Sequence, residues 1–221
     1  MLKLTAPGKN LKGFILHIQH SHRKKTFMEE QKKSMKCFRG FIAVDIKPSS
    51  EIYSLGREIK QTKTDVKLVE PENIHITLKF LGETQEELIK DIEEIMKESV
   101  KGLQPFTVQL KNVGVFPNKN YIRVVWIGIE NSEKLRKIAE HLDEHLTRLG
   151  FKKERKSFSA HLTIARVKSS KNKEKLLRVI EKYNDFEFTT NRVDTVKLKK
   201  SELTPMGPVY TTLCEIKLGT T

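Results

Sequence analysis

Two short phrases in the sequence combine residue types that can transfer protons and bind phosphate. Ile74-His75-Ile76-Thr77-Leu78 and Ala160-His161-Leu162-Thr163-Ile164 both read His, apolar, Thr, apolar within a β-branched run. Side chains alternate across a β-strand, so each phrase places its His and Thr on one face and its apolar residues on the other. Each predicted strand therefore presents an imidazole and a hydroxyl to one surface and buries the opposite surface.

Two histidines that face each other across a groove suit in-line displacement at a phosphodiester. One group must activate the attacking oxygen, and another must protonate the leaving oxygen on the opposite side of phosphorus. Imidazole can do both because its pKa of about 6.5 allows either protonation state near neutrality. The hydroxyls of Thr77 and Thr163 can donate to the non-bridging oxygens, where negative charge builds in the transition state. The pattern predicts a site that needs no metal ion and no cofactor.

A single His-x-Thr in a strand is more often a half-buried histidine beside a β-branched threonine than a catalytic pair. Here two copies lie 161 minus 75, or 86, residues apart, and a helix pattern follows each strand. The repetition favours the catalytic interpretation over the structural one.

Basic residues near the two phrases are further candidates. Arg123 could face the groove, and Lys79 shares the strand phase of His75 and Thr77, so we predict both as possible substrate contacts. Arg166 falls on the phase opposite that of the second histidine, which makes a structural ion pair at least as good an interpretation as a substrate contact.

Three aromatic residues could stack on a base of the substrate. They are Phe41, Phe158 and Tyr210. Packing in the core is the alternative for each of them.

A second histidine pair, His141 and His145, lies four residues apart in a predicted helix, a spacing that could hold a metal ion. No third ligand is apparent, and acidic residues surround the pair. A solvated helix face is the better interpretation.

The elements that must position these residues follow from periodicity. A strand is predicted at 39–45 and a helix at 51–60. The strand at His75 leads into a helix that begins with a capping box at Thr84–Glu87, and the strand at His161 leads into a helix over 172–183. A hairpin with its turn at 117–120 and a helix from 132 to Gly150 lie between the two phrases, and the chain ends in strands at 192–199 and 209–218.

This order predicts an α+β fold of two pseudo-symmetric lobes. Each lobe is a small, mainly antiparallel sheet with helices on the outside, and the active-site groove lies between the lobes.

Composition bounds the function. The chain has 221 residues, and 42 Lys plus Arg against 28 Asp plus Glu give a net charge of +14, which favours an anionic partner such as nucleic acid. No apolar run approaches the ~20 residues of a membrane span. Cys37 and Cys214 form neither a CxxC motif nor a Cys/His cluster, which argues against a disulfide framework or a zinc site. We expect a cytoplasmic monomer that contacts no membrane.

Residues 1–34 differ from the rest of the chain because they are strongly basic and lack regular periodicity. We interpret them as an N-terminal extension, disordered or non-native, with a basic RNA-holding arm as the alternative. Residues 35–221 form the predicted bilobal domain.

The stretches Pro71–Glu83 and Phe158–Arg166 resemble the two signature motifs of the two-histidine phosphoesterases, in particular the RNA 2′,3′-cyclic phosphodiesterase or 2′-5′ RNA ligase family. The match extends from Met35 nearly to the C-terminus, and Ala160 stands where this family often has Pro.

The resemblance implies hydrolysis of a terminal ribonucleoside 2′,3′-cyclic phosphate to a 2′-phosphate, with weak reversible 2′-5′ ligation in some members. It implies that His75 and His161 are the acid–base pair, His75 as proton donor and His161 as proton acceptor, and that Thr77 and Thr163 bind phosphate. RNA with a terminal cyclic phosphate is then the partner. The alternative is a non-catalytic RNA-binding protein that keeps the fold and the basic groove.

Overall fold

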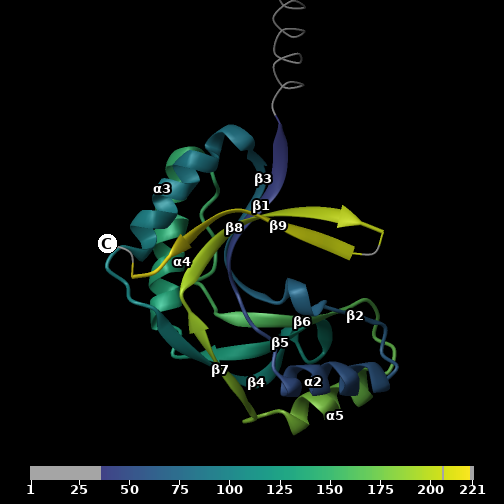
Figure 1. The fold of residues 1–221 in the computed structure, drawn as a ribbon. Helices are drawn as coiled ribbons and strands as arrows, with labels where there is room; N and C mark the ends of the chain where they lie inside the picture. Colours follow the sequence, from purple (N-terminus) through teal and green to yellow (C-terminus); the bar gives the residue numbers. More distant parts are fainter. Residues whose placement is uncertain (1–35, 206, 220–221) are drawn as a thin grey trace, which may run out of the picture. The chain divides into compact units, whose positions relative to one another are not determined.

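The computed structural model describes residues 36–205 and 207–219 (Figure 1). The predicted extension at residues 1–34 lies outside the described residues. The unit considered below is Phe38–Thr221, together with Cys37 as the first residue of its first strand. No helix in the described part of the chain is both long and apolar enough to cross a membrane.

The described residues of this unit form nine strands and four α-helices. The strands are β1 Cys37–Asp45, β2 Val66–Leu68, β3 His75–Gln85, β4 Phe106–Asn118, β5 Tyr121–Glu130, β6 His161–Val167, β7 Glu187–Val193, β8 Thr195–Thr204 and β9 Gly207–Lys217. The helices are α2 Ser50–Gln61, α3 Ile89–Val100, α4 Glu133–His145 and α5 Lys173–Lys182. Short 3-10 turns are η1 Pro71–Asn73, η2 Glu86–Leu88 and η3 Leu146–Leu149.

The predicted two lobes are two halves of one nine-stranded sheet. The strand order is β7-β4-β5-β6-β3-β1-β8-β9, with β2 paired to β6 at the side. We call β3-β1-β8-β9 the first half-sheet and β6-β5-β4-β7 the second half-sheet. They meet where β3 pairs with β6, in antiparallel register with Ile76 opposite Leu162. Each half-sheet therefore contributes one His-x-Thr strand to the junction.

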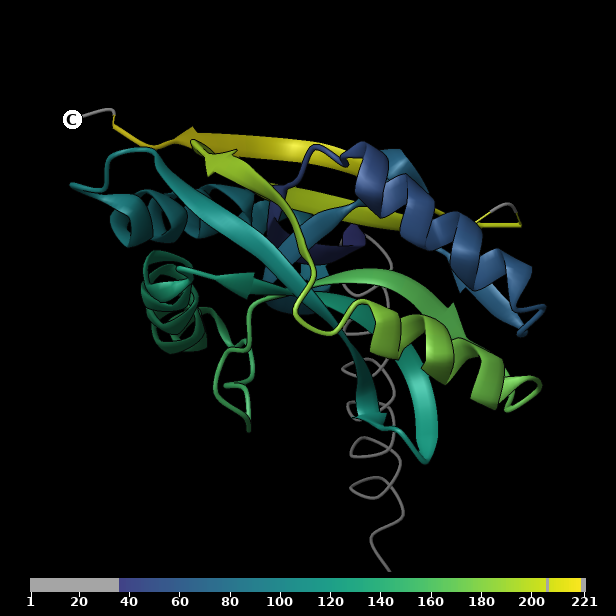
Figure 2. The ribbon, with the colours of Figure 1, turned by 90° about the horizontal axis from the view of Figure 1, so that it is seen from below.

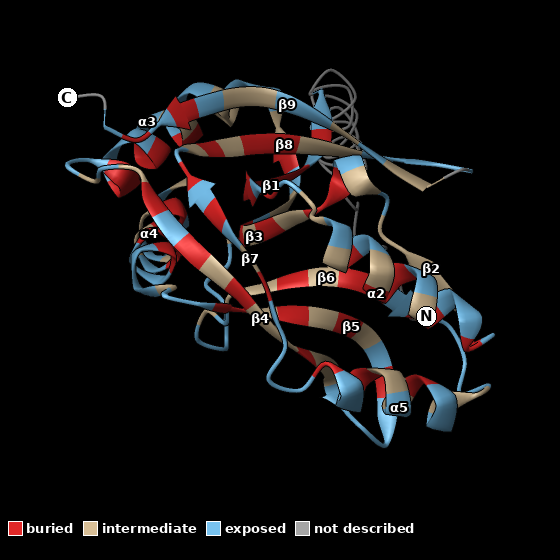
Figure 3. Ribbon diagram, turned by 60° about the horizontal axis from the view of Figure 1, so that its bottom comes forward, coloured by how far each residue is buried: buried red, intermediate tan, exposed pale blue. Residues whose placement is uncertain are grey.

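The helices cover the sheet in two pairs. α3 and α4 lie together, as do α2 and α5, and the two pairs stand apart, the first at the left and the second at the right of Figures 1 and 2. α4 buries Leu135, Ile138 and Leu142, spaced three and four residues apart, and exposes its other face (Figure 3). Burying one such side chain is worth about 1.5–3 kcal/mol, so these amphipathic stripes fix each pair against the sheet.

Two local predictions are confirmed. The chain turns between β4 and β5 and the two strands pair as an antiparallel hairpin. The helix after Ser132 continues through η3 and ends at Gly150, whose φ of 86° lies in the left-handed region that glycine adopts without strain.

The prediction of a capping box at Thr84–Glu87 is wrong. Thr84 is buried within β3, and its hydroxyl donates to the carbonyl oxygen of Gly82 at 3.1 Å. α3 begins at Ile89, after η2, and its N-cap residue makes no side-chain capping bond. Pairing in the sheet carries β3 past Gly82, so tertiary structure overrides the local capping signal.

The end of the chain holds a strand that the pattern did not reveal. The predicted strand at 192–199 is split between β7, which ends at Val193, and β8, which begins at Thr195. β7 pairs with β4 and β8 with β1, so the chain crosses from one edge of the sheet to the other half-sheet at this point.

Candidate active site

The two His-x-Thr phrases lie side by side at the junction of the half-sheets. Because Ile76 is directly opposite Leu162 in an antiparallel pair, the register places His75 opposite Thr163 and Thr77 opposite His161. Residues opposite each other share a face, with Cβ atoms about 5 Å apart. Ile76 and Leu162 are fully buried on the other face, whereas all four polar residues are partly exposed.

Both imidazoles are oriented by the same backbone contact. Nδ1 of His75 lies 2.7 Å from the carbonyl oxygen of Asn73, and Nδ1 of His161 lies 2.8 Å from that of Ser159. A carbonyl oxygen only accepts, so Nδ1 carries the proton and donates it. In the neutral ring Nε2 is then the basic nitrogen, which is the atom available to a reacting oxygen.

The threonine hydroxyls are available to a ligand. Within the described residues, neither the Thr77 hydroxyl nor the Thr163 hydroxyl is engaged in a hydrogen bond, and both side chains are partly exposed. Two hydroxyl donors therefore lie on the same face as the imidazoles.

Aromatic rings enclose His75. The Phe41 ring lies 4.9 Å and the Tyr210 ring 5.4 Å from its ring centroid. Asn73, whose carbonyl orients His75, also donates its amide Nδ2–H to the carbonyl oxygen of Pro208 at 3.0 Å. One residue of η1 thus fixes both the imidazole and the β9 segment that carries Tyr210.

Burial lowers the pKa of His75 below the usual 6.5. The hydrogen bond to Asn73 and the carboxylate of Asp45 oppose this, while the positive charges of Lys199 and Arg166 add to it. Lys199 is ion-paired with Asp45, and Lys197 lies 3.1 Å from the same carboxylate. Burial would raise the pKa of Asp45, but the hydrogen bonds and charges of these two lysines outweigh it and hold that pKa below its usual value.

A second aromatic pair stands beside His161. The Phe116 ring lies 5.1 Å from the His161 ring and 5.2 Å from that of Trp126, which is opposite Thr163 in the β5–β6 register. Gly114 makes room for the indole, because a Cβ there would lie 2.2 Å from a ring carbon of Trp126. Sequence reasoning missed Phe116, since only the β4–β5 pairing brings it to the site.

The strand phase predicted for Arg166 is wrong because β6 is irregular. The β5–β6 register shifts after Thr163, so that Val125 is opposite Ala165 and Val124 opposite Arg166. Val124 is also opposite Phe116, whose ring contacts His161. Arg166 therefore lies on the same face as the histidine, exposed. Its charge adds to the lowering of the His75 pKa by burial, and it opposes the burial that raises the pKa of Tyr210.

The structure brings two of the other predicted contacts to His75 and places two others elsewhere. Phe41 and Tyr210 lie beside His75, as described above, and Phe158 is half-buried and packs against the core. Arg123 lies near the start of β5, with its guanidinium 5.2 Å from the centre of the Tyr121 ring. It comes five residues before Gly128, the residue opposite His161, so it lies along β5 away from the histidines.

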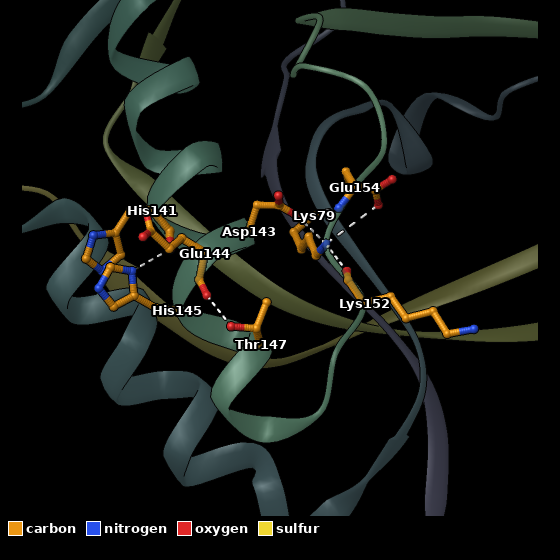
Figure 4. Close-up of polar contacts among 8 residues, drawn as sticks. All are labelled: Lys79, His141, Asp143, Glu144, His145, Thr147, Lys152 and Glu154. Atoms are coloured by element: carbon orange, nitrogen blue, oxygen red, sulfur yellow. Dashed lines mark hydrogen bonds and ion pairs between the residues drawn. The ribbon is translucent and has the colours of Figure 1, made fainter.

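Lys79 is committed to an ion pair outside the histidine cluster. Its ammonium lies 2.5 Å from Asp143 of α4 and 2.7 Å from the carbonyl oxygen of Lys152, with Glu154 at 3.7 Å (Figure 4). The residue is only 2% exposed, so the structure does not bring it together with His75 and Thr77.

His141 and His145 stack on α4 with ring centroids 3.9 Å apart (Figure 4). Among the described residues no group of three or more His, Cys, Asp or Glu side chains could hold a metal ion.

Comparisons with known proteins agree with this arrangement. Residues 39–202 match the 2′-5′ RNA ligase superfamily. A protein named RNA 2′,3′-cyclic phosphodiesterase from Methanocaldococcus jannaschii is 46% identical over 179 residues, which cover 80% of this chain and 99% of that protein. Its namesake from Methanothermobacter thermautotrophicus is 41% identical over 175 residues, covering 78% of this chain and 95% of the relative.

Solved structures show the same fold. A crystal structure of a Thermus thermophilus protein superposes with a TM-score of 0.67 at 29% identity, covering 81% of this chain and 97% of that chain. Apo E. coli LigT superposes with a TM-score of 0.63 at 22% identity, covering 84% of this chain and 99% of that chain.

Proposed function

The chain belongs to the 2′-5′ RNA ligase superfamily, and we propose that it is an RNA 2′,3′-cyclic phosphodiesterase that forms a 2′-phosphate. The observation that carries the proposal is the register at the junction of the half-sheets. It puts two imidazoles and two hydroxyls on one face, with each Nε2 available to the substrate.

The proposed reaction is an in-line displacement at phosphorus. His161 Nε2 accepts a proton from the attacking water as the new phosphorus–oxygen bond forms. The bond between phosphorus and the 3′ oxygen breaks, and His75 donates the Nε2 proton of its imidazolium to that oxygen. One proton is gained and one is lost, so exchange with solvent restores both histidines.

The charge on the phosphate is met by donors on the same face. The hydroxyls of Thr77 and Thr163 donate to the non-bridging oxygens, and the guanidinium of Arg166 adds positive charge beside them. Such donors stabilise the transition state most when they are already in place, and the sheet holds all three on paired strands.

The same groups can serve ligation. A 5′-hydroxyl of a second RNA end can take the place of water, and the product is then a 2′-5′ linkage. The residues do not separate hydrolysis from ligation, because in both reactions His161 takes the proton of the attacking water or hydroxyl and His75 protonates the leaving 3′ oxygen; cleavage of the 2′-5′ linkage reverses these roles.

The proposal is tested with the full chain and a mononucleoside 2′,3′-cyclic phosphate in the presence of EDTA. We expect the 2′-phosphate as product, and we expect His75→Ala and His161→Ala each to lower kcat by roughly 10²- to 10⁴-fold. The matched control is His145→Ala, which removes an imidazole from α4 and should keep full activity.

Near-normal turnover in both variants, or a 3′-phosphate product, would overturn the assignment. Binding of RNA without any turnover would support instead the non-catalytic RNA-binding alternative.

We further propose that the chain works as a monomer in the cytoplasm on RNA ends. The two cysteines are free in the structure, which suits a reducing compartment. Light scattering of the purified chain and cell fractionation test the two parts of this statement.

A further inference from the structure

The face that carries the histidines continues beyond them because a second strand is irregular. In the β4–β5 hairpin Phe116 is opposite Val124 but Pro117 is opposite Ile122, so Arg123 is an extra residue. The bulge shifts the alternation: Ile122 is buried in the core, and Tyr121 falls on the face shared by Val124 and Phe116.

Tyr121 is an exposed stacking platform on that face. The residue is 58% exposed. Arg123 lies against the ring at 5.2 Å, and this cation–π contact orients the phenol. An aromatic ring that is held in place and open to solvent is the feature on which proteins stack single-stranded bases.

A small cationic cavity adjoins this platform. It has a volume of about 200 Å³ and lies where β5 begins and β6 ends, next to the first turn of α5. No Asp or Glu is among its described lining residues, although Glu174 lies 3.7 Å from Lys173. Its polar and charged lining includes Tyr121, Arg123, Lys168, Ser169, Ser170 and Lys173.

Tyr121, which lines this cavity, lies at a defined distance from the histidines. Gly128 is opposite His161, and Tyr121 comes seven residues earlier on β5, which is about 20 Å along a strand. Arg166 lies between them, opposite Val124. A mononucleotide bound at the histidines cannot reach Tyr121, whereas a longer strand can pass Arg166 and continue to it.

Building on the proposed function, we propose that this surface is a subsite for a nucleotide upstream of the cyclic phosphate. We name it the Tyr121 subsite and define it by Tyr121, Arg123, Lys168 and Lys173. A base stacks on Tyr121, and the ammonium groups of Lys168 and Lys173 contact the backbone phosphates. The substrate is therefore single-stranded RNA several nucleotides long, and affinity for it exceeds that for a mononucleotide.

A larger cavity offers a comparison surface. It has a volume of about 900 Å³, and its lining mixes the basic residues Lys152, Lys153, Arg155 and Lys156 with the acidic residues Glu83 and Glu154. The mixed charge makes it a weaker track for a phosphate backbone, and its lysines provide a control that removes the same charge elsewhere.

The experiment measures kcat/KM for a mononucleoside 2′,3′-cyclic phosphate and for a pentaribonucleotide with the same terminus. We expect Tyr121→Ala to lower kcat/KM for the longer RNA about tenfold and to leave kcat/KM for the mononucleotide unchanged. Tyr121→Phe should keep the wild-type value for both substrates, because its ring can still stack on a base. The double variant Lys168→Ala with Lys173→Ala should weaken the salt dependence of kcat/KM for the longer RNA. The slope of log kcat/KM against log salt concentration should become shallower by about 0.7 for each lost phosphate contact.

The control combines Lys153→Ala with Lys156→Ala and should behave as wild type on both substrates. Unchanged kinetics for the longer RNA in the Tyr121 subsite variants would overturn the proposal, and so would a loss seen in the control instead. If the wild-type chain does not hydrolyse the mononucleotide, the proposed function itself fails, which is a separate result.

Discussion

At the scale of single residues, each histidine at the junction is oriented by its own backbone. The Nδ1–H of His75 donates to the carbonyl two residues before it, and that of His161 does the same. The orientation therefore needs no third side chain, unlike a histidine held by a carboxylate. A short segment contains the orienting carbonyl, the imidazole and, two residues later, the threonine hydroxyl.

Asp45 offers a direct test of the electrostatics at His75. The carboxylate raises the pKa of His75 and also offsets the charge of Lys199, which lowers it. Asp45→Asn should therefore lower the pKa of His75 further below 6.5, because burial and Lys199 then act without opposition from the carboxylate. The pKa is measured from the imidazole resonances of the full chain in an NMR titration.

Glu215→Gln is the matched control, since this carboxylate faces Lys197 at 3.8 Å rather than Lys199. A pKa of His75 that stays in place or rises in Asp45→Asn would show that Lys199 and Asp45 do not set it. If His75 is the acid, the same variant also loses turnover at neutral pH, because less imidazolium is present.

Strand alternation was enough to predict which threonines accompany which histidines, because both phrases precede any irregularity. It failed for Arg166, where the bulge after Thr163 reverses the phase. It could not find Phe116, because strand pairing brings that ring to His161 and no spacing in the sequence encodes it. Local rules thus recover residues within one regular strand and lose those that depend on bulges or on partner strands.

At the scale of elements, a buried ion pair fastens β3 to α4. Lys79 is almost fully buried, and Asp143, Glu154 and the carbonyl oxygen of Lys152 surround its ammonium. Burial would raise the pKa of Asp143, but the bonds from Lys79 and from the Glu154 N–H hold it below its usual value. The residue predicted as a phosphate contact thus joins the strand of the first histidine to a helix.

Removing one partner of this pair should destabilise the protein. Asp143→Asn leaves the buried ammonium without its carboxylate. We expect it to lower the free energy of unfolding, measured by urea denaturation, by about 3 kcal/mol. Lys79→Met should lower the free energy of unfolding by less than Asp143→Asn does, because it removes the buried charge itself. It should also leave kcat for the cyclic phosphate within about twofold, because the Lys79 ammonium is buried in the ion pair.

Lys97→Met is a control for loss of a lysine from an exposed ion pair, and we expect it to change stability little. A large fall in kcat for Lys79→Met with a normal unfolding midpoint would return Lys79 to the substrate site and contradict its structural role.

At the scale of the whole molecule, the site depends on how two half-sheets are joined. The repeated strand-and-helix order predicts two related lobes, and each half-sheet does contribute one His-x-Thr strand. The sequence pattern does not predict that the halves form one sheet, because that depends on the pairing of β3 with β6 between residues far apart in the chain. Both strands are held from the outside, β6 by β5 and β3 by β1.

The stacked histidines of α4 predict how the stability of the whole fold depends on pH. Burial and the neighbouring His145 lower the pKa of His141, Arg148 of η3 adds to this, and the carboxylates of Glu98 and Glu144 oppose it. In the unfolded chain the imidazole titrates near 6.5, so below that pH the unfolded state binds more protons than the folded state. The free energy of unfolding should therefore fall as the pH drops from about 6.5, and this contribution should be absent at higher pH.

Urea unfolding of the wild type and of His141→Gln between about pH 5 and 7 measures this pH dependence, and the variant should show the shallower slope of unfolding free energy against pH. An equal slope in the two proteins, or a wild type that gains stability on acidification, would contradict the depressed pKa of His141, whereas Asp194→Asn on the surface should leave the slope in this range unchanged.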